Sequence, residues 1–255
     1  MKLYKAYAKV NIFLKITGKR DEYHEILSRF MKVENLYDEL SFTPKEFEYF
    51  EIVGNFSCTT TQNTIYKAYV ALLEYTKSES LKNLMIKYAV NVKKNIPAFA
   101  GLGGGSSDAA TYLKMCNSVL HLDLSLNELA TIGLKVGADV PFFIYGYESA
   151  NVSGIGEIVE EFDEPLLDFD VYTPKVEIST PKVYISYRDN FYDPISEDES
   201  KKLKQMKSVD VLMNYTPIGV NDLFEPALRE YPSLKKYHKE GYFFSGSGSS
   251  FFKKL

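Results

Sequence analysis

The stretch Pro97-Ala-Phe-Ala-Gly101-Leu-Gly103-Gly104-Gly105-Ser106-Ser107-Asp108 places four glycines within five residues, directly ahead of a predicted helix. The helix is expected to run from about Ser107 to Leu120. Glycine lets the backbone turn several N–H groups toward one point and lets a ligand approach closely. Because the start of a helix adds unsatisfied donors and a partial positive charge, the sequence predicts a site for a polyphosphate.

Two better-known phosphate loops do not fit this stretch. No Gly-Lys-Ser/Thr follows the glycines at the spacing of a Walker A loop. The pattern G-x-G-x-x-G also fails, because its last position, counted from Gly101, is Ser106. A dinucleotide-dependent dehydrogenase is therefore disfavoured. The alternative that this stretch is a glycine-rich turn with a purely structural role remains.

Two further segments carry side chains that suit phosphoryl chemistry. Asp139, in Gly137-Ala-Asp-Val-Pro141, stands between a predicted helix over Asp123–Lys135 and a predicted apolar strand over Val140–Tyr145. Near the N-terminus, Lys9 and Asn11 alternate with apolar residues on a predicted strand, so both point to one face. The structural alternative for Asp139 is a solvated turn residue, and for Lys9 and Asn11 it is an ordinary surface strand.

Composition limits the class of protein. The 255 residues are enough for one large domain or two lobes, and 45% hydrophobic with 25% charged residues is typical of a soluble globular protein. A net charge of -4 argues against broad nucleic-acid binding. The apolar runs are too short for a membrane span, and the lysine-bearing N-terminus lacks the features of a signal peptide. We therefore expect a cytoplasmic protein that binds neither nucleic acid nor membrane. Two cysteines outside any CxxC pair make a zinc site improbable.

The remaining pattern mixes strands and helices without a regular βαβα rhythm, which favours a two-lobe α+β fold. A lobe boundary is expected near the turn Ser153–Gly156, and the charged segment 189–207 is expected to be exposed. The predicted strands are Leu3–Ile16, which ends at Thr17-Gly18, then Asn35–Phe42, Glu48–Val53, Leu84–Val92, Phe169–Val176 and Tyr242–Phe244. Helices are predicted over Thr64–Tyr75, Asn221–Arg229 and Pro232–Glu240.

Four segments resemble, in order along the chain, the motifs of the GHMP small-molecule kinases. They are the strand segment with Lys9 and Asn11, the glycine-rich stretch, Gly137–Pro141 and Ser245-Gly-Ser-Gly-Ser-Ser250. The resemblance covers about Ala6 to Phe252. It implies a two-lobe GHMP kinase fold of the α+β class, with the active site in the cleft between the lobes. The N-terminal ATP-binding lobe, residues 1–150, is expected to be ribosomal protein S5 domain 2-like, and the C-terminal lobe, residues 151–255, ferredoxin-like. The family usually continues well past this motif, so we expect the last part of the second lobe to be missing or replaced.

The segment Gly18-Lys-Arg-Asp-Glu-Tyr23-His24-Glu25 is similar to that of GHMP kinases whose acceptor carries a cytidine diphosphate group. This resemblance implies ATP- and Mg²⁺-dependent phosphorylation of the 2-hydroxyl of a methylerythritol moiety, in the non-mevalonate route to isoprenoid precursors. The expected oligomeric state is a monomer or dimer. A homoserine or mevalonate-type kinase of the same family and a catalytically inactive nucleotide-binding protein remain as alternatives.

The same resemblance implies roles for individual residues. Asp139 is expected to be the general base, with Lys9 beside it stabilising charge on the transferring phosphoryl group. No metal ligand is assigned, and Asp108 stands where an asparagine is common in the family. The residues expected to bind the acceptor substrate are Asn11, Tyr23, His24, Phe30, Thr180 and Tyr184. Those expected to bind ATP are Asn63, Lys94, Pro97, Gly101, Leu102, Gly103, Gly104, Gly105, Ser106, Ser107 and Asp108.

Overall fold

The computed structural model describes residues 2–255, which form two compact units. The first unit comprises the chain up to Ala8, Glu34–Ala98 and Gly103–Gly146. The second comprises Lys9–Val33, Phe99–Leu102 and Tyr147–Leu255. Each unit combines strands with helices, which confirms the predicted α+β class.

Two long strands contribute to both units. β1 spans Tyr4–Arg20 and pairs with β2, which spans Tyr23–Pro44. The predicted end of the first strand at Thr17-Gly18 is wrong, because β1 continues to Arg20 and the chain turns at Asp21-Glu22. Asp21 takes a positive φ of 53°, a conformation that aspartate tolerates better than most residues.

The sheet of the first unit is built on the second half of β2. Residues Glu39–Pro44 of β2 pair antiparallel with β4 (Tyr88–Lys93), and the short β3 (Ile52–Val53) adds parallel to β4. Leu40 lies opposite Val92 and both are buried, so this register directs apolar side chains to the core.

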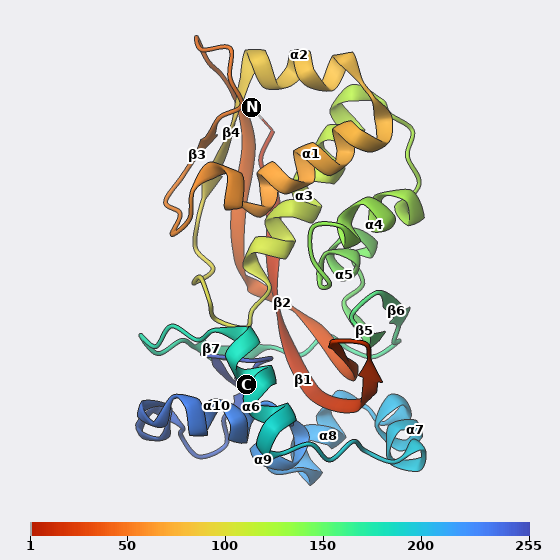
Figure 1. The fold of residues 1–255 in the computed structure, drawn as a ribbon, viewed down its shortest axis with the longest axis vertical. Helices are drawn as coiled ribbons and strands as arrows, with labels where there is room; N and C mark the ends of the chain where they lie inside the picture. Colours follow the sequence, from red (N-terminus) through yellow and green to blue (C-terminus); the bar gives the residue numbers. More distant parts are fainter. Residues whose placement is uncertain (1) are drawn as a thin grey trace. The chain divides into compact units, whose positions relative to one another are not determined.

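Five helices complete the first unit, and Figure 1 shows α1, α3, α4 and α5 gathered beside one another. α3 packs against α1 and α5, and its buried face includes Leu113, Met115 and Cys116. The helices are α1 (Thr64–Thr76), α2 (Glu79–Lys87), α3 (Gly104–Leu120), α4 (Leu126–Leu134) and α5 (Val140–Tyr145), with a 3₁₀-helix at Thr60–Gln62.

Three strand predictions in this unit are wrong. The strand predicted over Glu48–Val53 forms only in its last two residues, as β3. Val140–Tyr145 is the helix α5, in which Pro141 occupies the first turn, where proline is well tolerated. The predicted strand Leu84–Val92 begins too early, because α2 runs to Lys87 and β4 begins only at Tyr88. Ser78 caps α2 by accepting a hydrogen bond from the Leu81 N–H, a helix start that the strand prediction overlooked.

The second unit contains two sheets. The first half of β2, Ile26–Met31, pairs antiparallel with β5 (Ser149–Gly154), and β5 pairs with β6 (Ile158–Glu161). A separate sheet has the order β7-β9-β8, with β9 in the centre. Its strands are β7 (Phe169–Tyr172), β8 (Phe243–Phe244) and β9 (Phe251–Lys254).

Two helices of the second unit, Thr180–Asn190 and Phe224–Glu230, contribute side chains to an apolar cluster. Phe224 lies against Phe244 with ring centroids 4.7 Å apart, and Leu14 and Ile16 of β1 belong to the same cluster. The helices are α6 (Thr180–Asn190), α7 (Glu197–Gln205), α8 (Ser208–Asn214), α9 (Pro217–Val220) and α10 (Phe224–Glu230), with a 3₁₀-helix at Pro232–Tyr237.

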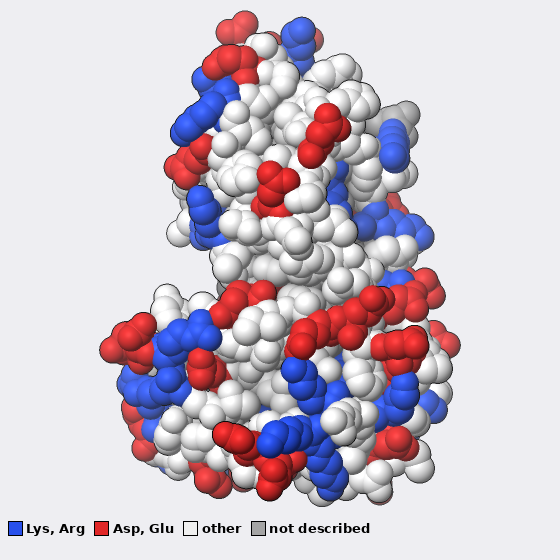
Figure 2. Space-filling model, turned by 90° about the vertical axis from the view of Figure 1, so that its right-hand side faces the viewer, with Lys and Arg blue, Asp and Glu red and all other residues white. Residues whose placement is uncertain are grey.

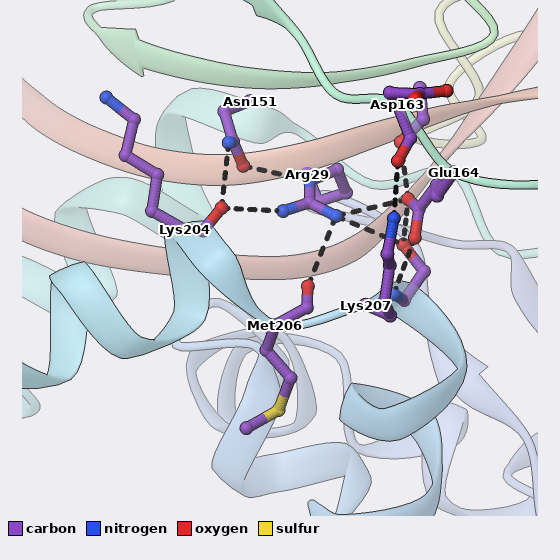
Figure 3. Close-up of polar contacts among 9 residues, drawn as sticks. Arg29, Asn151, Asp163, Glu164, Lys204, Met206 and Lys207 are labelled. Atoms are coloured by element: carbon purple, nitrogen blue, oxygen red, sulfur yellow. Dashed lines mark hydrogen bonds and ion pairs between the residues drawn. The ribbon is translucent and has the colours of Figure 1, made fainter.

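A buried arginine joins the α7–α8 connection to the sheet of the second unit (Figure 3). The Arg29 guanidinium donates to Glu164, to Asn151 and to the backbone carbonyls of Lys204 and Met206. Burial lowers the pKa of Arg29 to about 10, so the group stays charged at neutral pH. The segment 189–207, predicted as exposed, therefore contains α7 and backbone carbonyls that bind a buried cation.

On the face that Figure 2 shows, positive and negative side chains are interspersed rather than separated into large fields of one sign. Both signs mixed together are usual for the surface of a globular domain. Within the part of the chain that is described, none of the helices is long and apolar enough to cross a bilayer.

Candidate active site

The glycine-rich loop owes its shape to two residues with left-handed backbone. Gly101 has a φ of 72° and Gly103, the N-cap of α3, a φ of 71°. A side chain at either position would be strained, so glycine is required. α3 begins at Gly104, and the first N–H groups of a helix have no acceptor within the helix. The loop thus ends in a set of donors suited to an anion.

The ammonium of Lys94 lies beside the first turn of α3, inside the first unit. A Cβ added to Gly104 would lie 3.6 Å from Lys94 Nζ and 2.9 Å from Ile96 Cγ2. The missing side chain of Gly104 therefore lets the lysine approach the start of the helix closely. An ammonium beside helix N–H groups is an arrangement that can attract a phosphate.

Two buried carboxylates hold Lys94. Its ammonium donates to Asp38 Oδ2 and, over 2.7 Å, to Asp108 Oδ2. Asp38 also accepts from the backbone N–H groups of Asn95 at 2.5 Å and Ile96 at 2.8 Å. Asp38 was not among the predicted site residues. The sequence does hold a signal for Asp38. Residues two positions apart on a strand share a face, so Asp38 lies on the same face as the buried Leu40, and an acidic residue on a buried face is unusual.

Asp108 has fewer partners than Asp38. The residue is only 2% exposed, and its Oδ1 is buried without a hydrogen-bond partner among the described residues. Burial raises the pKa of the Asp108 carboxyl to about 7, because the attraction of Lys94 offsets desolvation only in part and Asp38 adds repulsion. Asp108 therefore changes charge near neutral pH.

The start of α1 is tied to the start of α3. Asn63 is buried and its side chain accepts from the Ile65 N–H, so it is the N-cap of α1. Thr64 Oγ1 donates to the Gly105 carbonyl over 2.6 Å. These contacts place Asn63 next to the predicted phosphate site, and its role in binding ATP stays a prediction.

Asp139 precedes α5 in the first unit. It occupies the N-cap position, and its side chain makes no capping hydrogen bond. A Cβ added to Gly137 would lie 3.7 Å from Ser106 Oγ, so the turn before Asp139 lies against the first turn of α3. Although the segment after Asp139 is a helix and not the predicted strand, Asp139 is only two residues from Gly137, which borders the glycine loop.

The second unit brings three other predicted residues together with Gly101. Lys9 is 3% exposed, and its ammonium donates to Asn11 Oδ1 at 2.5 Å and to the Gly101 carbonyl at 3.1 Å. The same ammonium lies 4.4 Å from the centroid of the Phe30 ring. An aromatic face next to a desolvated cation is favourable. The predicted Lys9, Asn11 and Phe30 therefore form one cluster.

The turn Ser245–Ser250 packs on this cluster. Ser245 Oγ donates to the Gly101 carbonyl at 3.0 Å and accepts from the Asn11 N–H at 3.3 Å. A Cβ added to Gly101 would collide with the Ser245 carbonyl oxygen. Ser245 was not among the predicted site residues, although it belongs to the predicted serine–glycine motif.

Residues predicted to recognise the acceptor lie elsewhere in the second unit. His24 and Tyr184 have ring centroids 5.4 Å apart with an interplanar angle of 30°. Tyr23, beside His24, is 64% exposed. Tyr187 and Tyr192, which the sequence analysis missed, also lie against His24. Burial lowers the pKa of His24, so its ring is neutral at physiological pH.

Thr180, at the start of α6, lies within hydrogen-bond distance of Ser247, with 2.7 Å between their hydroxyl oxygens. Of the other predicted residues, Leu102 and Ser107 are buried and Pro97 is exposed. The structure thus groups the predicted residues into one cluster around the first turn of α3 in the first unit and two clusters, around Lys9 and around His24, in the second.

Comparison with known proteins identifies the class. The family model of the GHMP kinases N terminal domain matches residues 63–147, which include the glycine loop and Asp139. Solved structures of mevalonate kinase and homoserine kinase share the fold, with TM-scores of 0.60 and 0.59 at 14% and 17% identity.

More similar relatives narrow the identification. A 4-diphosphocytidyl-2-C-methyl-D-erythritol kinase of Sulfurimonas denitrificans is 67% identical over 99% of this chain and 97% of its own length. One of Sulfurovum is 45% identical over 97% of both chains. A crystal structure of 4-(cytidine 5'-diphospho)-2C-methyl-D-erythritol kinase has a TM-score of 0.75 at 30% identity, covering 100% of this chain and 90% of the other.

The fold is that of a GHMP kinase, and the matched family model covers the glycine loop. Within that class, the chain belongs to the family of 4-diphosphocytidyl-2-C-methyl-D-erythritol kinases.

Proposed function

We propose that this chain transfers the γ-phosphoryl group of ATP to the 2-hydroxyl of 4-diphosphocytidyl-2-C-methyl-D-erythritol, a step of the non-mevalonate route to isoprenoid precursors. The observation that carries the proposal is the 67% identity, over nearly the whole length, with a relative of that name. The buried ammoniums of Lys9 and Lys94 support the proposal, because phosphoryl transfer needs cations near the phosphates.

ATP is proposed to bind with its phosphates at the first turn of α3. The supporting observations are the left-handed Gly101 and Gly103 and the ammonium of Lys94 beside Gly104. Mg²⁺ would be held mainly by phosphate oxygens and water. Among residues 2–255 there is no group of three His, Cys, Asp or Glu side chains placed to hold a metal ion.

Asp139 is proposed to accept the proton of the acceptor hydroxyl, and Lys9 to stabilise charge on the transferring group. A positioned general base contributes roughly 10²–10⁴-fold to a rate. The hydrogen bonds of Lys9 to Asn11 and Gly101 support its part, because they fix a buried ammonium in one orientation.

Tyr23, His24 and Tyr184 are proposed to recognise the cytosine ring, and Asn11, Phe30 and Thr180 to line the rest of the acceptor site. The tilted packing of the His24 ring on the Tyr184 ring, with centroids 5.4 Å apart, supports this assignment. Residues 1–150 are proposed to form the ATP-binding domain and residues 151–255 the second domain. The protein is proposed to act in the cytoplasm, where ATP is available, as a monomer or dimer.

The direct test is a phosphoryl-transfer assay with ATP, Mg²⁺ and 4-diphosphocytidyl-2-C-methyl-D-erythritol, with NMR locating the new phosphate. The proposal predicts phosphorylation at the 2-hydroxyl and a loss of roughly 10²–10⁴ in kcat for Asp139→Asn, with ATP affinity little changed. Homoserine and mevalonate serve as competing acceptors. Phosphorylation of either in preference to the cytidine compound would reject the substrate assignment, and near-normal kcat in Asp139→Asn would reject the base.

A further inference from the structure

Three side chains of the first unit form a buried cluster in which the negative groups outnumber the positive one. Asp38 comes from β2, Lys94 follows β4, and Asp108 lies on α3. Two carboxylates share one ammonium, so the fully ionised cluster carries a net charge of minus one. Asp38 and Asp108 are 0% and 2% exposed, and an uncompensated charge at such depth is strongly disfavoured.

The two carboxylates are not equivalent. Asp38 accepts hydrogen bonds from Lys94 and from two backbone N–H groups, so it has three donors. Asp108 accepts from Lys94 alone, and its Oδ1 has no partner among residues 2–255. Lys94 and Asp38 are the charged groups that act on Asp108. A proton that enters the cluster therefore binds to Asp108, and burial places the pKa of this carboxyl at about 7.

A bound polyphosphate would change this balance. Its negative charges would arrive at the first turn of α3, four residues before Asp108, and would repel the carboxylate. If Lys94 turned toward the phosphates, Asp108 would also lose its only hydrogen-bond donor and remain as an isolated buried charge. Both effects favour protonation of Asp108. Asp38 would keep its two backbone donors in either state.

We propose that nucleotide binding is coupled to the uptake of one proton by Asp108, which ends the hydrogen bond from Lys94 to Asp108 and lets the ammonium turn to the phosphates while Asp38 still accepts from it. Asp38 and Asp108 are then positioning residues for Lys94. The proton comes from solvent and forms an O–H bond on Asp108, and no other bond is made or broken. The proposal rests on the proposed function insofar as it takes ATP as the ligand.

The direction of the pH effect follows from this coupling. Below about pH 7 Asp108 is largely protonated before ATP binds. The affinity of the native chain for ATP therefore does not depend on the protonation of Asp108 in that range. Above that pH each binding event must take a proton from solvent. The affinity of the native chain is therefore expected to fall by up to about tenfold per pH unit.

The test is isothermal titration of the full chain with ATP and Mg²⁺, in buffers of equal pH and different ionisation enthalpy. Asp108→Asn is the matched control, because asparagine has the same shape and still offers Lys94 an oxygen but cannot titrate. At pH 8 the native chain should take up nearly one proton more per ATP than the variant. The titration of ATP itself is common to both and cancels in this difference.

Equal proton uptake and equal pH dependence of affinity in the two proteins would overturn the inference and leave the kinase assignment intact. Failure of the native chain to bind ATP at any pH would overturn the proposed function as well. A second measurement does not depend on the variant folding: carboxyl ¹³C NMR of the native chain should show the Asp108 titration moving to higher pH when ATP is added. An unmoved titration would also contradict the coupling.

Discussion

Arg29 and Glu164 form an ion pair of 3.1 Å in which the arginine side chain is 0% and the glutamate 3% exposed. Glu164 also accepts from the hydroxyl of Ser149 at 2.6 Å and from the Ser208 N–H at 2.7 Å. A buried ion pair contributes little over an apolar replacement of the same volume, but removing one partner leaves the other charge uncompensated. Glu164 is therefore expected to be essential for the stability of the second unit.

Glu164→Gln should destabilise the protein by about 3–5 kcal/mol, because the guanidinium of Arg29 would stay buried without a counter-charge. Urea denaturation would give the change in the free energy of unfolding. The matched control is Glu148→Gln, which removes an ion pair of 3.0 Å with Lys32 whose glutamate is 58% exposed. That variant should lose at most about 1 kcal/mol. A similar decrease in the free energy of unfolding in both variants would show that burial does not determine how much the Arg29–Glu164 pair matters for stability.

Gly101→Ala should lower both stability and kcat. Gly101 has a φ of 72°, and an added Cβ would collide with the Ser245 carbonyl, so the loop and the serine–glycine turn would have to separate. The Gly101 carbonyl also accepts from Lys9, and a shift of about 1 Å in a positioning group can cost roughly 10²-fold in rate.

Gly146→Ala is the control for the backbone conformation alone. Gly146 has a φ of 74°, and within the described chain nothing lies within 4 Å of an added Cβ. It should cost about 1–2 kcal/mol of stability and leave kcat near the native value. Steady-state kinetics and thermal unfolding of both variants would compare them. A normal kcat in Gly101→Ala would mean that the loop does not position Lys9.

The stability of the protein without ligand should fall as pH rises from about 4 to 7. Burial raises the pKa of Asp108 from 3.8 to about 7, so over this interval the folded state binds a proton that the unfolded state has lost. The contribution is complete below pH 4 and is lost as pH passes through 7, with a slope of at most about 1.4 kcal/mol per pH unit. Urea midpoints of native chain and Asp108→Asn between pH 5 and pH 8 would measure it. A gap between the two proteins that does not widen with pH would contradict the assignment.

Tyr184→Ala should raise the KM for the cytidine substrate. Loss of one stacking ring costs roughly 1–3 kcal/mol in base recognition, which corresponds to a rise of about 5- to 150-fold. The KM for ATP should change little. Tyr184→Phe keeps the aromatic face beside His24 and should behave like the native protein. Equal effects on both KM values would indicate a general structural role instead of contact with cytosine.

The glycine loop could be predicted from sequence because its chemistry is local. Four glycines before a helix determine backbone conformation and donor direction without help from distant residues. The predicted helix from Ser107 and the structural α3 from Gly104 differ only at the first turn. The order of the motifs along the chain was enough to predict the class of fold and the family, which the comparisons confirm.

Other features depend on contacts that a single sequence does not reveal. Val140–Tyr145 is apolar throughout, and a short apolar run has no periodicity that separates a buried strand from a buried helix. Asp38 acquires its importance only when β2 brings it to Lys94, 56 residues later. Arg29 similarly needs Glu164, which is 135 residues away. The roles of Lys9 and Asp139 in catalysis stay predictions that the variants above test.

The distribution of the chain over two units has a consequence for the folding rate. Asn11 bonds to Ser245 across 234 residues, and Leu14 and Ile16 pack with Phe224, Phe244 and Phe251. Such high contact order makes closure of the second unit slow, since loop entropy is lost before the contacts form. The first unit, whose helices pack mainly on near neighbours, is expected to collapse earlier. In that interval the apolar side chains of β1 remain uncovered, and refolding should become less efficient as protein concentration rises.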